Sequence, residues 1–291
     1  MSRSTTLVLG LGLLLVSATS LAETVGLKLC TGSPDGNYFA SGEEIKRQVQ
    51  RQSIQVELVA TGGSMDNLKR MADGECDAGF AQIDAYLHYQ ALNRESRLAV
   101  EWPKHLYEEY VHLVCHRDSR IASIEDFAQA ENPYSLVVGA PGSGSAMTWD
   151  SFTRLNPDYL VVTTKEADGA EALQSVKEGN TDCMMLVSGL GSKQLSLVDA
   201  SAAQLRLVGV DDRDLQQAKH FGKPIYQFQP IPAGTYPGLQ APSGKSVETL
   251  TVKAIMLVAS AWAGAHAVAY EALIEGVDRA TPIIQKRVTA N

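Results

Sequence analysis

The chain has 291 residues, of which 45% are hydrophobic and 20% charged, with a formal net charge of −8. This length predicts about two domains of a soluble α/β protein, which is large enough to bury hydrophobic cores without stabilising disulfides or metal ions. The acidic balance excludes a nucleic-acid-binding protein, because such proteins need clustered Lys and Arg.

The first 22 residues are typical of a secretory signal peptide. Arg3 gives a positive start, residues 7–16 form an apolar core, and Ser20-Leu21-Ala22 places small residues where signal peptidase reads them. The apolar run is shorter than the ~20 residues that a membrane span needs. We therefore predict secretion with cleavage after Ala22, and an uncleaved anchor and a buried helix are the alternatives.

The first part of the mature chain alternates between strand and helix patterns. We expect strands at 25–31, 54–60 and 77–80, and helices at 38–51, 65–72 and 85–94. Gly62 and Gly63 punctuate the loop between the second strand and its helix. In open α/β sheets, ligands bind beyond the carboxyl ends of the strands, where helix N-termini point into a crevice. This order predicts a small-molecule pocket beside residues 61–64.

Polar residues around this predicted pocket each have two interpretations. Ser64 is a ligand-binding hydroxyl or an N-cap, and Tyr38 contacts the ligand or packs in the core. Gln82 is a plausible amide donor to the ligand, whereas Asp84 either faces the pocket or caps the helix that follows.

The second part of the chain repeats this pattern. Further strands are expected at 111–115, 135–140, 160–164, 182–187, 205–210 and 251–258, and helices from about 123, at 146–155, at 167–178 and at 260–275. Gly36 corresponds to Gly142, and Asp77 to Asp182, at offsets of 106 and 105 residues. We interpret the two halves as β-α-β-α-β units that form two similar lobes facing one another, with chance similarity as the alternative.

The loop Gly142-Ser143-Gly144-Ser145 occupies the equivalent place in the second half. It lacks the Lys-Ser/Thr of a P-loop and the third glycine of a dinucleotide fingerprint, which excludes a nucleotide site. A helix N-terminus with free N–H groups and hydroxyls suits a carboxylate or another small oxyanion. A purely structural tight turn is the alternative.

Catalytic and metal constellations are missing from the sequence. The chain has no G-x-S-x-G motif, and its six His residues share no compact motif with a Ser or Cys. Glu108 and Glu109 are adjacent, so they point to different faces, and we expect both on a solvated surface. His112 and His116 lie too far apart on a strand to share a metal. We predict a protein that is not an enzyme and has no cofactor and no metal.

The four cysteines match no zinc pattern. They are Cys30, Cys76, Cys115 and Cys183. In an oxidising compartment they allow three pairings, but all four fall on or next to predicted strands, so buried free thiols are at least as well supported.

Several motifs together resemble one family. Thr31-Gly32-Ser33 with Gly36-Asn37-Tyr38 is similar to its opening block, Thr61–Ser64 with Asn67 to its second, and Val138–Ser145 to its third. Ala233-Gly234-Thr235-Tyr236-Pro237 is similar to its late block. These blocks, in this order, resemble the TAXI family, the extracytoplasmic solute receptors of TRAP (tripartite ATP-independent periplasmic) transporters.

The resemblance implies a fold and a binding site. The fold is an α/β, two-lobed periplasmic-binding-protein fold, type II-like, with the ligand in the cleft between the lobes. Residues 23–110 and about 225–291 would form the first lobe, and 111–224 the second. The implied ligand-binding residues are Gly36, Asn37, Tyr38, Thr61, Gly63, Ser64, Asn67, Gln82, Gly142, Ser143, Gly144, Ser145, Ser188 and Tyr236.

The resemblance also implies a function. A periplasmic receptor would capture a small carboxylate, such as glutamate, glutamine or 2-oxoglutarate, and deliver it to the membrane subunits of a TRAP transporter. None of the polar loops carries the pocket Arg that other TRAP receptors use. A sensor that signals to a membrane kinase and a secreted enzyme on the same scaffold are the alternatives.

Overall fold

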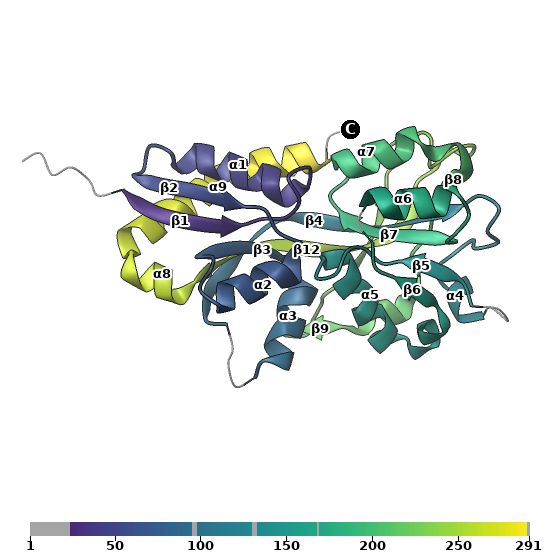
Figure 1. Ribbon diagram of the computed structural model, residues 1–291, viewed down its shortest axis with the longest axis horizontal. Coiled ribbons are helices and arrows are strands. Elements are labelled where there is room, and N and C mark those ends of the chain that lie inside the picture. The colour runs from purple at the N-terminus through teal and green to yellow at the C-terminus, as the bar shows by residue number, and fades with distance from the viewer. Residues whose placement is uncertain (1–23, 95–97, 130–132, 168, 290–291) are drawn as a thin grey trace, which may run out of the picture.

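The computed structural model describes residues 24–94, 98–129, 133–167 and 169–289. The predicted signal peptide, residues 1–22, lies outside the described residues. The chain forms two α/β units joined side by side (Figure 1). We call the unit built on β1–β3 the first lobe and the unit built on β5–β7 the second lobe.

The first lobe begins with parallel strands and connecting helices. They are β1 (Val25–Cys30), α1 (Asn37–Val49), β2 (Ile54–Val59), α2 (Ser64–Ala72), β3 (Ala78–Gln82) and α3 (Ile83–Leu92). The strands run parallel in the order β2-β1-β3, with Leu29 opposite Ala78. β3 is buried along its whole length, as expected of an inner strand covered on both faces. The carboxyl ends of these strands therefore meet at one edge, which faces the second lobe.

The second lobe repeats this arrangement. Its elements are β5 (Ser135–Val137), α5 (Gly144–Leu155), β6 (Thr163–Lys165), α6 (Gly169–Lys177) and β7 (Cys183–Ser188). The strands run parallel in the order β6-β5-β7, which matches β2-β1-β3. The strand expected at 160–164 is displaced, because Pro157–Val161 forms a 3-10 turn before β6.

Asp77 and Asp182 show that the repeat is structural. Asp77 Oδ2 accepts a hydrogen bond from the backbone N–H of Lys28 at 2.8 Å, and Asp182 Oδ2 accepts one from the N–H of Ser135 at 2.8 Å. In each lobe this carboxylate, just before the third strand, ties that strand to the first strand. The interpretation of the sequence as two equivalent halves is therefore confirmed.

Two long antiparallel strands run through both lobes. β4 (Val100–His116) pairs with β12 (Val247–Ala259) over its first part and with β7 from Tyr110 onward. β12 also pairs with β3, so it joins the first lobe's parallel strands to β4. Figure 1 shows both strands crossing the middle of the molecule. β8 (Leu205–Val208) adds to β4, and β11 (Gln227–Ile231) adds to β12.

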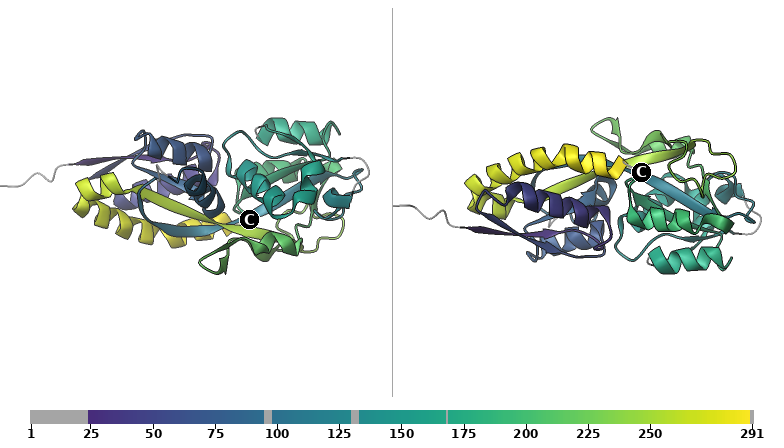
Figure 2. Two further views of the ribbon diagram at one scale, coloured as in Figure 1. Left: turned by 90° about the horizontal axis from the view of Figure 1, so that it is seen from below. Right: turned by 90° about the horizontal axis from the view of Figure 1, so that it is seen from above.

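Helices cover both faces of this sheet. The remaining elements are α4 (Asp126–Gln129), α7 (Lys193–Ala200), β9 (Lys219–His220), β10 (Lys223–Pro224), α8 (Ser260–Ala265) and α9 (Ala267–Thr289). Figure 2 shows α9 lying along α1 with its end reaching the second lobe, where Val288 O accepts from Gly191 N–H at 2.8 Å. The helix expected at 260–275 is thus broken at His266 and continues much further.

All four cysteines are paired. Cys30 bonds to Cys76 in the first lobe, and Cys115 bonds to Cys183 between β4 and β7. All four are buried. The interpretation as buried free thiols is therefore wrong, because the fold brings together cysteines that are 46 and 68 residues apart in the sequence.

The division of the chain between the lobes stays a prediction. Within the late segment that we assigned to the first lobe, Ile231, Tyr236 and Leu239 pack in a cluster with Leu186 and Leu207. Arg117 also donates to the carbonyl of Ala241 at 2.9 Å. Residues 231–241 therefore lie against the second lobe before β12 returns to the first.

Candidate binding site

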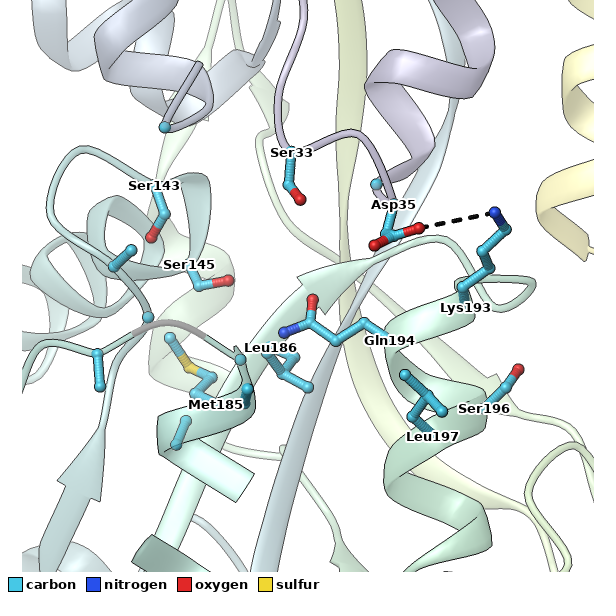
Figure 3. Close-up of a pocket in the computed structure, with 18 of the residues that line it drawn as sticks. Ser33, Asp35, Ser143, Ser145, Met185, Leu186, Lys193, Gln194, Ser196 and Leu197 are labelled. Atoms are coloured by element: carbon cyan, nitrogen blue, oxygen red, sulfur yellow. Dashed lines mark ion pairs between the residues drawn. The ribbon is translucent and has the colours of Figure 1, made fainter. Parts of the chain in front are cut away.

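A cavity of about 900 Å³ lies between the two lobes. First-lobe loops before α1 and α2 form one wall, and β7, α5, α6 and α7 form the other (Figure 3). The lining residues are Ser33, Asp35, Gly36, Thr61, Gly62, Gly139, Ala140, Ser143, Ser145, Ala167, Gly169, Ala170, Ala172, Met185, Leu186, Gly191, Lys193, Gln194, Ser196 and Leu197.

Helix N-termini surround this cavity. α1 starts after Gly36, α5 after Ser143, α6 at Gly169 and α7 at Lys193. The first N–H groups of a helix have no partner within it, and they carry partial positive charge. Ser143 Oγ accepts from one of these groups, Ala146 N–H, at 3.2 Å. The arrangement presents hydrogen-bond donors from both lobes to an anionic group.

Among the described lining residues, Asp35 and Lys193 are the ones with charged side chains. Their Oδ1 and Nζ atoms are 3.7 Å apart, and both side chains are highly exposed. Figure 3 shows this ion pair spanning the cavity mouth from the loop before α1 to the start of α7. The two charged side chains of the cavity therefore lie at its rim, where they pair with each other.

Four of the predicted ligand-binding residues line the cavity. They are Gly36, Thr61, Ser143 and Ser145. The Ser145 hydroxyl already accepts from Val187 N–H at 2.9 Å, so it also fixes α5 to the end of β7. The other predicted residues are not among those that line the cavity.

The predicted residues of α2 have structural partners. Ser64 Oγ accepts from Gln82 N–H at 3.1 Å, and Asn67 Nδ2 donates to Thr31 O and Phe80 O at 2.5 and 2.7 Å. Both side chains are completely buried. They tie the start of α2 to strands β1 and β3, and they shape the loop that reaches the cavity.

The two small-residue loops contact each other. Met65 N–H, in the first turn of α2, donates to Gly142 O at 3.1 Å across the lobes. A Cβ on Gly63 would lie 3.5 Å from Ser143 Cα, so the two backbones approach closely here. The α2 N-terminus, which the sequence suggested as an anion site, thus binds the carbonyl of the opposite loop. We call this contact the loop seam.

Two further predicted residues join the lobes nearby. Asn37 Nδ2 donates to Ser188 Oγ at 3.2 Å. Tyr236 is buried in the second lobe, where its hydroxyl donates to Leu190 O at 2.8 Å and lies 3.1 Å from His112 Nε2. Tyr236 therefore holds the loop before α7 in place through this hydrogen bond to Leu190 O. Burial lowers the pKa of His112 to about 4, so its ring is neutral near pH 7.

Glu109 is buried, and the expectation of a solvated surface is wrong for it. The carboxylate accepts from Gln82 Nε2 at 2.9 Å, Tyr38 OH at 3.2 Å and Tyr107 OH at 3.3 Å. Its neighbour Glu108 keeps partial exposure and pairs with His105 at 3.3 Å. Successive side chains of a strand point to opposite faces, so Glu108 and Glu109 do face different sides. Because β4 is an inner strand, the side that Glu109 faces is buried in the core. Burial raises the pKa of Glu109 to about 8.

Asp84 does not line the cavity, and it lies in the first turn of α3, where its Oδ1 accepts from Ala85 N–H at 2.8 Å. Its Oδ2 accepts from Thr148 in α5 at 2.9 Å and from Tyr226 at 2.7 Å. Thr148 Oγ1 also donates to Gln82 Oε1 at 3.3 Å. Burial raises the pKa of this carboxyl as well. We call Gln82, Asp84, Glu109, Thr148 and Tyr226 the hinge network, because it connects β3 and α3 of the first lobe, together with the shared strand β4, to α5 of the second lobe.

The wall that α7 contributes was not predicted from the sequence. Lys193, Gln194, Ser196 and Leu197 follow the Ser188–Ser192 loop. A loop with Gly189 and Gly191 directly before an N-cap Ser192 is a helix-start signal that could have indicated this wall. Figure 3 shows the Gln194 amide reaching across the cavity.

No group of three His, Cys, Asp or Glu side chains within the described ranges is placed to hold a metal ion. Across residues 24–289, with the gaps given above, no helix has the length and apolarity to cross a bilayer.

The model of the NMT1-like family matches residues 29–268. The chain belongs to the NMT1-like family. Its structure is similar to those of two sulfonate-binding proteins and of a protein from Bordetella bronchiseptica RB50. The last has a TM-score of 0.56 at 13% identity, covering 88% of this chain and 70% of that chain.

The two sulfonate-binding neighbours are both named SsuA. The periplasmic aliphatic sulphonate binding protein of Escherichia coli gives a TM-score of 0.55 at 12% identity, covering 89% of this chain and 69% of that chain. The alkanesulfonate-binding protein of Xanthomonas axonopodis pv. citri, bound to MOPS, gives a TM-score of 0.53 at 14% identity, covering 89% of this chain and 74% of that chain. At such identities the likeness concerns the fold, and it confirms the predicted two-lobed periplasmic-binding-protein fold for this member of the NMT1-like family.

Proposed function

We propose that this protein is a periplasmic solute receptor that captures a small organic anion or amino-acid-like solute between its lobes and does not transform it. The observation that carries the proposal is the convergence of the N-termini of α1, α5, α6 and α7 on one inter-lobe cavity. Partial positive charges on fixed N–H groups recognise a carboxylate or sulfonate without an arginine. The names of the two SsuA neighbours, which are binding proteins for sulfonates, agree with an anionic solute.

The same proposal includes the route of the solute. The TAXI resemblance supports delivery to the membrane subunits of a TRAP-type secondary transporter, with glutamate, glutamine and 2-oxoglutarate as the first solutes to test. Lobe closure around the solute would present a composite surface to the membrane subunits, because the ligand shifts the population toward the state it binds better. Residues 1–22 would be removed during export by cleavage after Ala22.

A thermal-shift screen tests the binding step. We expect the mature chain to be stabilised by at least one carboxylate, sulfonate or amino acid, since a ligand at 100 times its Kd adds ~2.7 kcal/mol to the free energy of unfolding. Neutral sugars of similar size serve as the control series. If the mature protein shows a shift with no member of the anionic and zwitterionic panels, the proposed function is wrong.

A further inference from the structure

The second-lobe wall of the cavity is mainly apolar. Met185 and Leu186, which are buried in the middle of β7, line this wall together with three alanines of the α6 region, Ala167, Ala170 and Ala172. Leu197 of α7 lines the same wall, although 66% of this residue is exposed. A large apolar side chain that is exposed inside a concave site offers surface that a ligand can cover.

The charges at the cavity set a limit on the charge of the ligand. Lys193 is the one basic side chain among the described lining residues, and it faces Asp35 at 3.7 Å. The pair contributes no net charge. One anionic group can be held by helix N-terminal N–H groups and by Lys193, whereas a second carboxylate would meet either apolar side chains or Asp35.

The size of the cavity gives a third constraint. About 900 Å³ lies near the top of the ~300–1,000 Å³ range of small-molecule sites. A four- or five-carbon diacid would leave much of this space and the apolar wall unfilled. The cavity therefore fits a ligand with a substantial apolar body and one charged end.

We propose that the cavity binds an organic monoanion, with a carboxylate or sulfonate head held by the N-termini of α5 and α7 and by Lys193, and with an apolar body lying on the exposed side chain of Leu197. This inference rests on the proposed function and narrows its solute class away from dicarboxylates. Asp35 has a defined part in it. It holds Lys193 at the mouth of the cavity and repels a second negative charge.

Isothermal titration of the mature chain with two matched series tests the inference. One series contains straight-chain monocarboxylates and monosulfonates from four to eight carbons, and the other contains α,ω-dicarboxylates of the same lengths plus 2-oxoglutarate. We expect the monoanions to bind more tightly, with Kd falling about fourfold for each added methylene, the value for burying one CH₂. The carboxylate and sulfonate arms show which head group is preferred.

Three variants and one control locate the two ends of the ligand. Leu197→Ser should flatten the chain-length dependence, whereas Leu160→Ser, which changes an equally exposed leucine outside this cavity, should leave it intact. Lys193→Met should weaken monoanion binding about tenfold or more, and Asp35→Asn should selectively improve the binding of dicarboxylates. Circular dichroism confirms that each variant is folded.

The possible results separate the two proposals. Tighter binding of dicarboxylates, or a Kd independent of chain length, overturns the monoanion inference and leaves an anion receptor in place. An absence of binding by both series together with a negative thermal-shift panel overturns the proposed function itself. A chain-length dependence that survives in Leu197→Ser also overturns the inference, because the apolar body would then lie elsewhere.

Discussion

Raising the pH from about 6.5 to 8 is expected to lower the free energy of unfolding of the wild-type chain by ~2 kcal/mol, and Glu109→Gln is expected to abolish this loss. Burial, partly offset by the hydrogen bond from Gln82, raises the pKa of Glu109 to about 8, with the nearby Asp84 charge acting in the same direction as burial. In the unfolded chain a Glu titrates near 4.3. Between these two values the folded state keeps a proton that the unfolded state has released.

The sign follows from this difference. A raised pKa contributes stability that is complete below the unfolded value and is lost as the pH rises through the folded value, at up to ~1.4 kcal/mol per pH unit. His112 acts in the opposite sense, because burial lowers its pKa to about 4 and its contribution is lost as the pH falls below ~6.5. A series above pH 6.5 therefore reduces the contribution of His112, and the comparison with Glu109→Gln separates Glu109 from Asp84, whose pKa burial also raises.

Urea denaturation at pH 6.5, 7, 7.5 and 8 measures the effect. Glutamine matches the shape of a protonated carboxyl group and keeps an acceptor for Tyr38 and Gln82, so Glu109→Gln should fold normally and show a flat profile. Glu108→Gln is the matched control, because it changes an adjacent carboxylate with a partly exposed side chain, and it should follow the wild type. A parallel decline in wild type and Glu109→Gln would show that another group controls stability in this range.

The burial of Glu109 also shows why the sequence predicted some parts of the fold better than others. The β-α-β-α-β halves were predictable, because strand periodicity and helix-start residues are local patterns in the sequence. The correspondence of Asp77 to Asp182, 105 residues later, also indicated the repeat. β4 was expected only at 111–115, yet it begins at Val100. Its first part pairs with β12, almost 150 residues further along, and no local pattern contains that pairing.

The site was predicted in outline for the same reason. Small residues before a helix indicate a helix start, so Gly36 and Ser143 were found beside the cavity. The contact between the lobes decides which helix N-termini keep free N–H groups. In the loop seam, Gly142 O accepts a hydrogen bond from the first turn of α2. Lys193 and Leu197 complete the cavity only because α7 packs opposite the loop before α1.

The contact between the lobes leads to a second expected result, in which Gly144→Ala destabilises the protein by roughly 2 kcal/mol. Alanine at an exposed helix position is favoured over glycine by ~1 kcal/mol, so helix propensity alone predicts stabilisation. At this position, however, a Cβ would lie 2.6 Å from Gln82 Cδ and closer still to its Oε1. Gln82 cannot swing away freely, because its amide is buried and bonded to Glu109 and Thr148.

The steric cost of the added Cβ is therefore larger than the gain in helix propensity. Displacing Gln82 leaves buried polar groups of the hinge network without a partner, at ~1–3 kcal/mol for each. Gly62→Ala is the matched control in the loop seam, since its Cβ would meet no atom nearer than Pro141 O at 3.5 Å, an ordinary contact. Its free energy of unfolding should stay within ~0.5 kcal/mol of the wild type.

A double-mutant cycle with Gln82→Ala separates the clash from other effects of the added methyl group. In the Gln82→Ala background the space beside residue 144 is open, so Gly144→Ala should cost little there and helix propensity should dominate. The coupling energy between the two substitutions, measured by urea denaturation, is expected to be 1–3 kcal/mol. A cost for Gly144→Ala that is unchanged by removing Gln82 would show that the strain does not come from Gln82 and would contradict the prediction.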